Sequence, residues 1–491
     1  MSAASAHPVP AAAAPEEASP HTTLTETIRI RLRTPARRRN LELVLLVGAF
    51  LLAGGALALV DLGTLGRVGG TMMLLEAVLA LLILAVHVTL RVVAPDADPF
   101  LLPIATLLNG LGIAEITRID IAKGWTGWDA NGVKQVVWSA MAIVIALVVV
   151  LVIRNHRVLQ RYRYIAMFVA LALLLLPMLP LIGKTVNGAR VWIGIGPFSF
   201  QPGELTKIAL AIFFAGYLVT ARDSLAIGGR RLLGMRLPRV RDLGPIVVVW
   251  LAAMAVIVFQ HDLGTGLLYF GLFLVMIYVA TGRFSWVVLG LILFVGGAFA
   301  ASRALAYVGG RIDSWLDAFS KTNYDKPGGS YQLVQGIFGL SDGGLIGTGL
   351  GRGRPQITPL SQSDYIMASL GEELGLIGVF AILALYLLFV SRGFRIGFTG
   401  QDDFGRLLGV GLSFVVALQT FIVIGGITRV IPLTGLTTPF MAAGGSSLVA
   451  NWIIVALLLR LSDSVRSQPR WVVDTPAAGT ALGGPTARGA R

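Results

Sequence analysis

Twelve long apolar runs constrain this chain more than any other feature. Most reach the ~20 residues that an α-helix needs to cross the hydrocarbon core of a bilayer. Only 13% of the residues are charged, whereas soluble globular chains carry roughly twice that fraction. The sequence therefore predicts an all-α polytopic membrane protein, because helices satisfy their own backbone polar groups in lipid. The runs fall near residues 41–60, 71–93, 99–117, 135–153, 163–182, 203–221, 244–260, 263–280, 284–304, 367–391, 405–428 and 436–460.

Arginine and lysine residues gather in alternate connections between these runs and predict how the chain crosses the membrane. Cytoplasmic connections of membrane proteins carry an excess of these residues. With the N-terminus in the cytoplasm, the most basic connections all fall inside: 154–163, 222–241, 392–406 and the segment after Arg460. Both termini are then expected in the cytoplasm. The segments left facing outward are 183–202, the junction at Asp262 and the insert 305–366.

The net charge of +14 and the absence of cysteine exclude several classes of function. Most of the excess charge lies in short loops and tails, and no stacking aromatic residues interleave the arginines, so a nucleic-acid partner is not expected. A chain without cysteine has no disulfides, thiolate metal sites or cysteine nucleophiles. Residues 1–40 begin with an Ala/Pro-rich stretch that cannot bury a core, so a disordered cytoplasmic tail is predicted there.

Asp262 is the candidate around which the outward face is organised. It stands between the apolar runs 244–260 and 263–280, at or just inside the outer membrane surface. Ionisable groups at that depth are expensive and therefore point to function. Aspartate is also a good N-cap, so Asp262 could simply satisfy the first free amides of the next helix. These residues alone leave both interpretations open.

The insert 305–366 is too long for a plain connection. It contains Gln332, Gln335 and a glycine series at 343–351. Glycines at that density let a backbone turn tightly or approach a ligand closely. The alternative is a flexible surface loop.

The outward face also carries more cations than the topology favours. Arginine and lysine suit an anionic ligand such as phosphate. The alternative is pairing with aspartates on the same face, and the two are compatible. The cations are Lys184, Arg190, Arg303, Arg311, Lys321, Lys326, Arg352, Arg354 and Arg429, and the aspartates are Asp313, Asp317, Asp325, Asp342 and Asp364.

Glu204 and Lys207 open the run 203–221 and are i,i+3 neighbours, close enough to form an ion pair. Within a membrane helix such a pair lowers the cost of burying either charge. A purely structural pair is the more common case. Near the far end of the chain, the segments 432–440 and 444–447 predict a broken, polar start to the last helix. Irregular backbone at that depth requires a cover of protein or a water-filled cavity.

Four separated stretches together resemble the SEDS glycosyltransferases, the RodA/FtsW/SpoVE group that polymerises peptidoglycan. They are NGARVW at 187–192 with QPGELTK at 201–207, DLGT at 262–265, GEELG at 371–375, and PLTG at 432–435 through GGSS at 444–447. The last stretch is more similar to the RodA (elongation) branch than to the FtsW (division) branch. The chain departs from the family pattern at His261, Gly203 and Val423, where proline, serine and asparagine are common. His261 is nearest the chemistry and could alter the acidity of Asp262.

The resemblance implies a ten-helix core at 97–462 with one large extracellular loop at 305–366. Two extra N-terminal helices at 41–96 make about twelve in all, and residues 463–491 form a disordered cytoplasmic tail. It also implies a multi-pass protein of the bacterial cytoplasmic membrane that polymerises lipid II, a disaccharide-pentapeptide on a polyprenyl pyrophosphate. A class B penicillin-binding transpeptidase is the implied protein partner. The rival interpretations are a lipid-linked precursor flippase or transporter, a division-specific paralogue and a scaffold without catalysis.

Asp262 is then the expected catalytic base, because glycosyl transfer requires deprotonation of the acceptor hydroxyl. Outward cations or a divalent ion, magnesium or manganese, would offset the charge of the leaving pyrophosphate. The candidate substrate-binding residues are Lys184, Arg190, Gln201, Glu204, Lys207, Arg311, Gln332, Gln335, Asp364, Glu373, Ser446 and Ser447. Asp364 and Glu373 are the alternative bases. Glu204 and Lys207 are expected to position the cavity more than to perform the chemistry.

Overall fold

The computed structural model describes residues 35–180, 182–186, 188–195, 198–227, 231–232, 235–236, 251, 255 and 258–467. Within them, nine helices are long and apolar enough to cross a membrane. These are α1 (Pro35–Leu65), α2 (Gly70–Val93), α4 (Asn131–Val152), α7 (Gly203–Ile227), α9 (Leu263–Thr281), α10 (Ser285–Ala304), α14 (Ile366–Thr399), α15 (Asp403–Ile427) and α16 (Gly445–Ser467). The polytopic helical fold predicted from the apolar runs is confirmed.

Two further predicted runs are also helical but do not meet that standard. The helix α3 (Leu101–Lys123) carries several charged residues, and α6 (Arg163–Leu175) is shorter and ends in the 3-10 turn η2 (Leu176–Met178). The run predicted at 244–260 lies almost entirely outside the described residues. The remaining short elements in this half are η1 (Gly127–Asp129), α5 (Arg157–Arg161), β4 (Arg231–Leu232) and β5 (Met235–Arg236).

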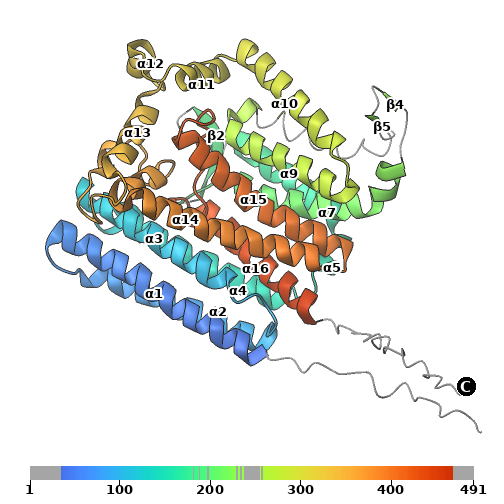
Figure 1. Cartoon of the computed structure of the whole chain (residues 1–491), viewed down its shortest axis with the longest axis horizontal. Helices are drawn as coiled ribbons and strands as arrows, with labels where there is room; N and C mark the ends of the chain where they lie inside the picture. Colours follow the sequence, from blue (N-terminus) through green and yellow to red (C-terminus); the bar gives the residue numbers. More distant parts are fainter. Residues whose placement is uncertain are drawn as a thin grey trace, which may run out of the picture. The chain divides into compact units, whose positions relative to one another are not determined.

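The helices α7, α15 and α16 form the centre of the bundle. Between 72% and 78% of their most apolar windows are buried, whereas only 6% of the corresponding window of α10 is buried. Apolar side chains exposed on a membrane helix face lipid, so α10 lies at the periphery. Figure 1 shows α1 and α2 on the opposite side of the bundle from α9 and α10.

The two N-terminal helices pack directly on the bundle. The helix α1 lies along α3, and α2 lies along α4 (Figure 1). Leu46 of α1 and Leu79 of α2 belong to the main hydrophobic core. Glu42, which is fully buried, accepts a hydrogen bond from Arg39 at 2.7 Å and pairs with His87 at 2.7 Å. Arg39 also donates to the backbone carbonyl of Ala97, which joins this hairpin to the start of the core.

The insert 305–366 is folded, so the flexible-loop alternative does not describe it. It forms α11 (Ala306–Leu316), α12 (Lys321–Asp325), α13 (Tyr331–Gly343) and the 3-10 turn η3 (Pro355–Ile357). The outward connection at 183–202 is a three-stranded antiparallel sheet of β1 (Gly183–Val186), β2 (Ala189–Ile195) and β3 (Phe198–Phe200). Gly183 pairs with Ile193, and Ile193 pairs with Phe200. This small sheet is an exception to the all-α prediction.

Glycine and proline break two of the predicted helices. In α14, Gly375 has φ +70°, and its backbone lies so close to Gly347 that a Cβ atom would come within 2.3 Å of the Gly347 nitrogen. The last run was predicted at 436–460, but α16 begins only at Gly445. Residues 431–444 are not helical, since Pro432, Gly435 (φ +76°) and Pro439 interrupt them. The broken helix start expected from this segment is therefore present.

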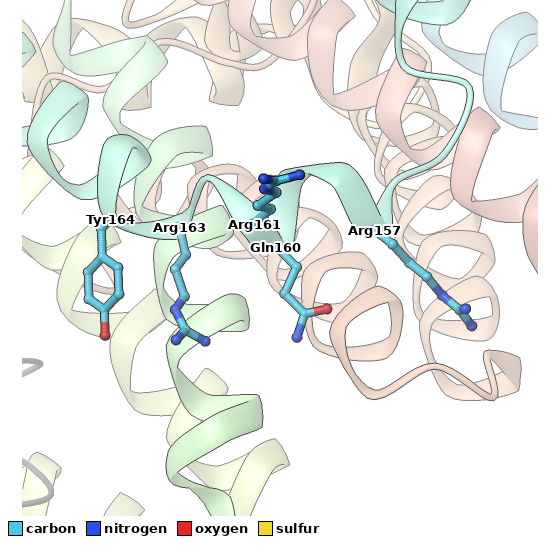
Figure 2. A pocket seen from close by; sticks show the side chains of 5 residues that line it. All are labelled: Arg157, Gln160, Arg161, Arg163 and Tyr164. Carbon is cyan, nitrogen blue, oxygen red and sulfur yellow. The ribbon is translucent and has the colours of Figure 1, made fainter.

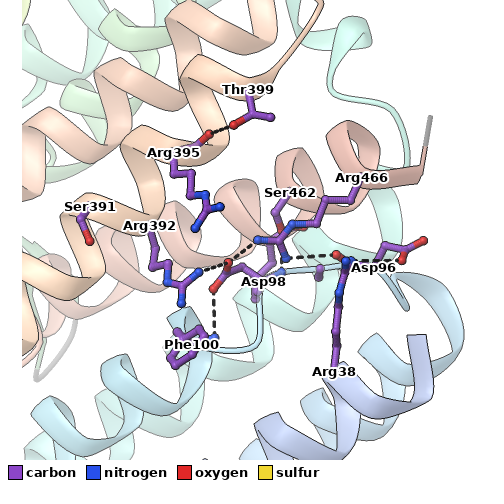
Figure 3. A network of polar contacts seen from close by, with 12 residues as sticks. Arg38, Asp96, Asp98, Phe100, Ser391, Arg392, Arg395, Thr399, Ser462 and Arg466 are labelled. Atoms are coloured by element: carbon purple, nitrogen blue, oxygen red, sulfur yellow. Dashed lines mark hydrogen bonds and ion pairs between the residues drawn. The ribbon is translucent and has the colours of Figure 1, made fainter. Parts of the chain in front are cut away.

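A charged network holds the segment before α3 against the C-terminal parts of α14 and α16 (Figure 3). Asp98 is fully buried and pairs with Arg466 at 2.5 Å and with Arg392 at 3.8 Å. Ser462 accepts a hydrogen bond from the Asp98 backbone amide at 2.9 Å. The Arg392 guanidinium also stacks on the Phe100 ring, 3.9 Å from its centroid. Residues 35–40 belong to α1 and residues 463–467 to α16, so the predicted tails 1–40 and 463–491 each included a helix end.

Candidate active site

Asp262 caps the N-terminus of α9, as one of its two interpretations required. Its Oδ1 atom accepts a hydrogen bond from the Thr265 amide at 3.0 Å, and its Oδ2 atom accepts from the Thr265 hydroxyl at 2.6 Å. The carboxylate is half-buried. Burial raises the pKa of Asp262, and the Thr265 hydrogen bonds and the Arg311 charge act against that rise. A cap with a raised pKa can also take up a proton, so the structural role does not exclude catalysis.

Arg311 connects the segments that surround Asp262. It extends from α11 and donates to the backbone carbonyls of Leu433 and Thr434 at 3.4 and 3.2 Å. Its charge lowers the pKa of both Asp262 and Asp364, which places it within electrostatic range of both. Gly264 of α9 meets the same loop, because a Cβ atom there would lie 3.0 Å from Thr434. We refer to Asp262, Arg311, Asp364 and Thr434 as the outer cluster.

Asp364 lies just before α14, at the end of the folded insert. Burial raises its pKa to about 6, with a further rise from the charge of Asp262 and opposing effects from Ser363 and Arg311. The nearest group to the Cβ position of Gly435 is the Asp364 carboxylate, at 3.7 Å, so this acid also faces the 431–444 segment. The outer cluster therefore combines two acids, one arginine and one threonine from four separate parts of the chain.

His261 adopts the left-handed conformation, with φ +61°. Its Nδ1 atom lies 3.3 Å from the carbonyl oxygen of Gly188, and its ring centroid lies 4.4 Å from that of Tyr307. The imidazole thus faces the β1–β2 turn and α11. The expected effect of His261 on the acidity of Asp262 stays a prediction.

The predicted ion pair between Glu204 and Lys207 is present and buried, with 2.6 Å between Nζ and Oε2. Lys207 also donates to Gln419 of α15 at 2.9 Å and to Asn451 of α16 at 3.4 Å. Ser447 accepts a hydrogen bond from Asn451 at 3.2 Å, so the candidate Ser447 belongs to the same network. Gln419 and Asn451 were not predicted. The available signal was a single amide side chain inside each of two otherwise apolar runs.

The start of α7 lies beside the start of α9. Tyr269 donates to the Gly203 carbonyl at 2.5 Å. Gln201 lies 3.5 Å from the Asp262 carboxylate, and the charge of Glu204 raises the pKa of Asp262. The structure thus brings Gln201 and Glu204 near the catalytic candidate, as the prediction for these residues requires.

Glu373 occupies a separate buried network. It pairs with Arg118 of α3 at 2.8 Å and accepts hydrogen bonds from the amides of Gly351 and Gly353 at 2.8 and 3.2 Å. The neighbouring Glu372 accepts from the amide of Arg354. These contacts fold the glycine series against α14. Every described partner of the Glu373 carboxylate is internal to the protein, so the structure offers no support for Glu373 as an alternative base. Arg118 was not predicted.

Among the described residues, no hydrogen bond or ion pair joins the other candidates to the outer cluster. Arg190 donates to the carbonyls of Pro177 and Leu179, which attaches the sheet to the end of α6. Lys184 lies on β1 opposite Trp192. Gln332 and Gln335 donate within the insert, to Pro359 and Tyr324. Ser446 is buried at the start of α16.

Apart from Arg311, whose charge acts on Asp364, the outward cations that the structure describes show no pairing with the outward aspartates. Within the described part of the chain, no ion pair joins the two groups. Arg190, Arg311 and Arg429 donate to backbone carbonyls. A carbonyl orients a guanidinium but leaves its charge uncompensated, which favours the anionic-ligand interpretation of these cations.

No group of three or more histidine or acidic side chains in the described ranges is arranged to hold a metal ion. Asp262 and Asp364 could supply two carboxylates to a divalent ion. Magnesium is commonly bound by one or two carboxylates together with substrate phosphates, so this donor set is compatible with an ion that arrives with its substrate.

The chain matches known proteins over most of its length. The model of the FtsW/RodA/SpoVE family, described as cell cycle protein, matches residues 100–467. The peptidoglycan glycosyltransferase RodA of Mycobacterium tuberculosis is 43% identical over 452 residues, which cover 90% of this chain and 95% of that protein. Stage V sporulation protein E of Bacillus subtilis is 35% identical over 302 residues, covering 60% of this chain and 77% of that protein.

Solved structures share the fold. A chain of a peptidoglycan synthase complex has a TM-score of 0.59 at 23% identity and covers 76% of this chain and 99% of its own. A mutant of the Thermus thermophilus rod shape determining protein RodA has a TM-score of 0.52 with the same identity and coverage. With the family model covering the whole helical core from α3 to α16, the chain belongs to the FtsW/RodA/SpoVE family of cell cycle proteins.

Proposed function

We propose that this protein polymerises lipid II into glycan strands at the outer face of the bacterial cytoplasmic membrane. The observation that carries the proposal is Asp262, held at the end of a membrane helix beside Arg311 and near Asp364. The 43% identity to proteins named peptidoglycan glycosyltransferase RodA, over 90% of the chain, supports the same activity. It also supports a role in cell elongation, because the relatives named FtsW are 30–33% identical.

In the proposed reaction the acceptor sugar hydroxyl attacks the anomeric carbon of the donor. A carbon–oxygen bond forms between the two sugars, and the bond from the anomeric carbon to the pyrophosphate breaks. Asp262 takes the hydroxyl proton as the new bond forms, a role for which burial prepares it by raising its pKa. The electron pair of the broken bond leaves with the pyrophosphate.

Arg311 is the proposed electrostatic partner of the leaving group. It is fixed by two backbone carbonyls before substrate binds, so it needs little reorganisation as negative charge develops. Asp364, whose pKa is raised to about 6, changes charge near neutral pH and thereby tunes Asp262. A divalent ion bound by Asp262 and Asp364 would supply further positive charge when the pyrophosphate binds.

The proposed topology has both termini in the cytoplasm, which places the outer cluster and the folded insert outside. A class B penicillin-binding transpeptidase is the proposed partner, since it would cross-link the strands made here. A structural neighbour comes from a peptidoglycan synthase complex described as coordinating polymerization and crosslinking. That neighbour supports a partner of this type.

The test is lipid II polymerisation by the purified chain, with and without a class B transpeptidase. We expect glycan strands from the chain itself, in an amount that the partner increases. A chain that moves lipid II across a vesicle membrane but never joins two disaccharides would be a flippase instead. A chain that does neither, yet binds the transpeptidase, would be a scaffold.

A further inference from the structure

The turn between α4 and α6 contains an open pocket at the end of the bundle away from the outer cluster. Its volume is about 390 Å³, and it is lined by Arg157, Gln160, Arg161, Arg163 and Tyr164. Figure 2 shows Arg157, Gln160, Arg163 and Tyr164 extending from one side of the turn, whereas the Arg161 side chain lies on the opposite side of the ribbon. Three guanidinium groups within eight residues make this pocket strongly cationic.

Most of this positive charge lacks an acidic partner. Arg157 forms an ion pair of 3.3 Å with Asp402, and His156 lies 2.9 Å from the same carboxylate. Arg163 donates to the Gly216 carbonyl at 2.9 Å and to the Thr220 hydroxyl at 3.3 Å, both of them neutral oxygen atoms. Within the described ranges, Arg161 forms no ion pair.

Two other arginines at this end of the bundle do have acidic partners. Arg466 lies 2.5 Å from Asp98, and Arg222 lies 3.0 Å from Asp403. Membrane topology favours arginines on one side but does not require three of them to line one concavity with a single carboxylate at its edge. The excess charge in the pocket therefore points to an anionic ligand.

The pocket lies at the level of the membrane surface, because α4 ends at Val152 and the apolar helix α6 begins at Arg163. On α6, directly after the pocket, Ile165 is 57% exposed and Phe168 is 65% exposed. Tyr164 is 47% exposed at the boundary, where aromatic rings favour the headgroup region. A ligand with a phosphate in the pocket could therefore lay hydrocarbon chains along α6.

We propose that the Arg157–Tyr164 pocket binds the phosphate headgroup of an anionic phospholipid, with the acyl chains against Ile165 and Phe168. Arginine recognises phosphate through charge-assisted and often bidentate hydrogen bonds. The site is distinct from the outer cluster and does not take part in glycosyl transfer. Its placement in the cytoplasmic leaflet rests on the topology of the proposed function, whereas the binding itself does not.

The test is titration of the full chain, purified in a neutral detergent, with phosphatidylglycerol or phosphatidylcholine, followed by native mass spectrometry. We expect the first phosphatidylglycerol to bind at least tenfold more tightly than phosphatidylcholine. Arg161→Gln should weaken that binding by roughly fivefold, since each basic residue near a lipid surface contributes about that factor. The triple variant R157Q/R161Q/R163Q should weaken it further. Arg395→Gln is the matched control and should bind like the parent, because Arg395 is exposed at the same end but outside the pocket.

Equal affinity for the two lipids, or equal losses in Arg161→Gln and Arg395→Gln, would overturn the proposal.

A separate arm of the experiment uses sodium phosphate alone. Displacement of phosphatidylglycerol only at a large excess of phosphate supports a lipid ligand, whereas inorganic phosphate binding as tightly as the lipid would assign the pocket to a free anion. The Arg161→Gln variant removes no hydrogen bond found in the described structure, so its result does not depend on a folding defect. Lipid binding is read without lipid II, so failure here leaves the proposed polymerase activity untouched.

Discussion

Arg118 of α3 and Glu373 of α14 form an ion pair of 2.8 Å that is almost completely shielded from solvent, with 6% and 0% of their side chains exposed. Glu373 also accepts hydrogen bonds from the backbone amides of Gly351 and Gly353. One buried carboxylate of α14 therefore fixes the glycine series of the folded insert and α3 to α14. Asp364 lies in the same insert, so this pair positions part of the outer cluster from a distance.

Arg118→Ala is expected to destabilise the protein by about 3–5 kcal/mol, because it leaves Glu373 buried without a counter-charge. Replacing both members of the pair, as in Arg118→Met/Glu373→Met, should lower the free energy of unfolding less than Arg118→Ala does, because no uncompensated charge remains. Thermal unfolding of the purified variants in one detergent measures both effects. If the double replacement were the less stable of the two, the glycine-series amides would outweigh the ion pair.

Glu204 and Lys207 offer a second exchange experiment. The alanine variants of either residue should lose stability and activity, because each leaves a buried charge. If the pair is structural, Glu204→Lys/Lys207→Glu should recover part of that loss. Lys207 also donates to Gln419 and Asn451, so full recovery is not expected. An exchange no better than the worse alanine variant would assign separate ligand-binding or catalytic roles to the two side chains.

The raised pKa of Asp364 predicts that the stability of the protein depends on pH. The pKa of Asp364 is raised to about 6 in the folded protein, above the ordinary aspartate value of 3.8. Between those two values the folded state binds the proton more tightly, so the free energy of unfolding should fall as pH rises from about 4 to 6. Asp364→Asn removes this titration and should be more stable than the parent at pH 8, with a smaller advantage at pH 4. Unfolding temperatures measured across this pH range provide the check, and parallel curves for the two proteins would contradict it.

Deletion of residues 1–95 tests the role of the N-terminal helices. No residue of the outer cluster lies in them, so turnover per folded molecule should be retained. Stability should fall, because Leu46, Leu79 and Val86 leave the main core and Ala97 loses the hydrogen bond from Arg39. Polymerisation normalised to the folded fraction distinguishes the two effects. A well-folded truncated protein without turnover would show that α1 and α2 take part in the chemistry.

The sequence predicted those features that depend on local pattern. The apolar runs located the helices, and the i,i+3 spacing predicted the Glu204–Lys207 pair. The capping role of Asp262 also followed from its position before an apolar run. These inferences succeed because length, hydrophobicity and helical spacing are properties of one segment at a time.

Features that depend on tertiary contact were missed. Arg118, Gln419 and Asn451 are polar residues inside apolar helices, and their partners lie far away in the sequence. The helices of the insert have only 5 to 13 residues, so a search for long apolar runs passes over them. The start of the last helix was placed too early, because 436–444 is apolar enough to resemble a helix although Pro439 interrupts it.

Asp262→Asn separates a catalytic base from a helix cap at this position. Asparagine keeps the size of the side chain and can still cap α9, so the fold should be preserved. The matched control is Asp402→Asn, because Asp402 caps α15 through the Gly405 amide at 2.8 Å at a site away from the outer cluster. With purified parent and variants at equal folded concentration, the measurement is the initial rate of lipid II polymerisation. The expected result is a fall of ~10²–10⁴-fold for Asp262→Asn and little change for Asp402→Asn. Polymerisation by Asp262→Asn at close to the parent rate would contradict it and would leave Asp262 as a helix cap alone.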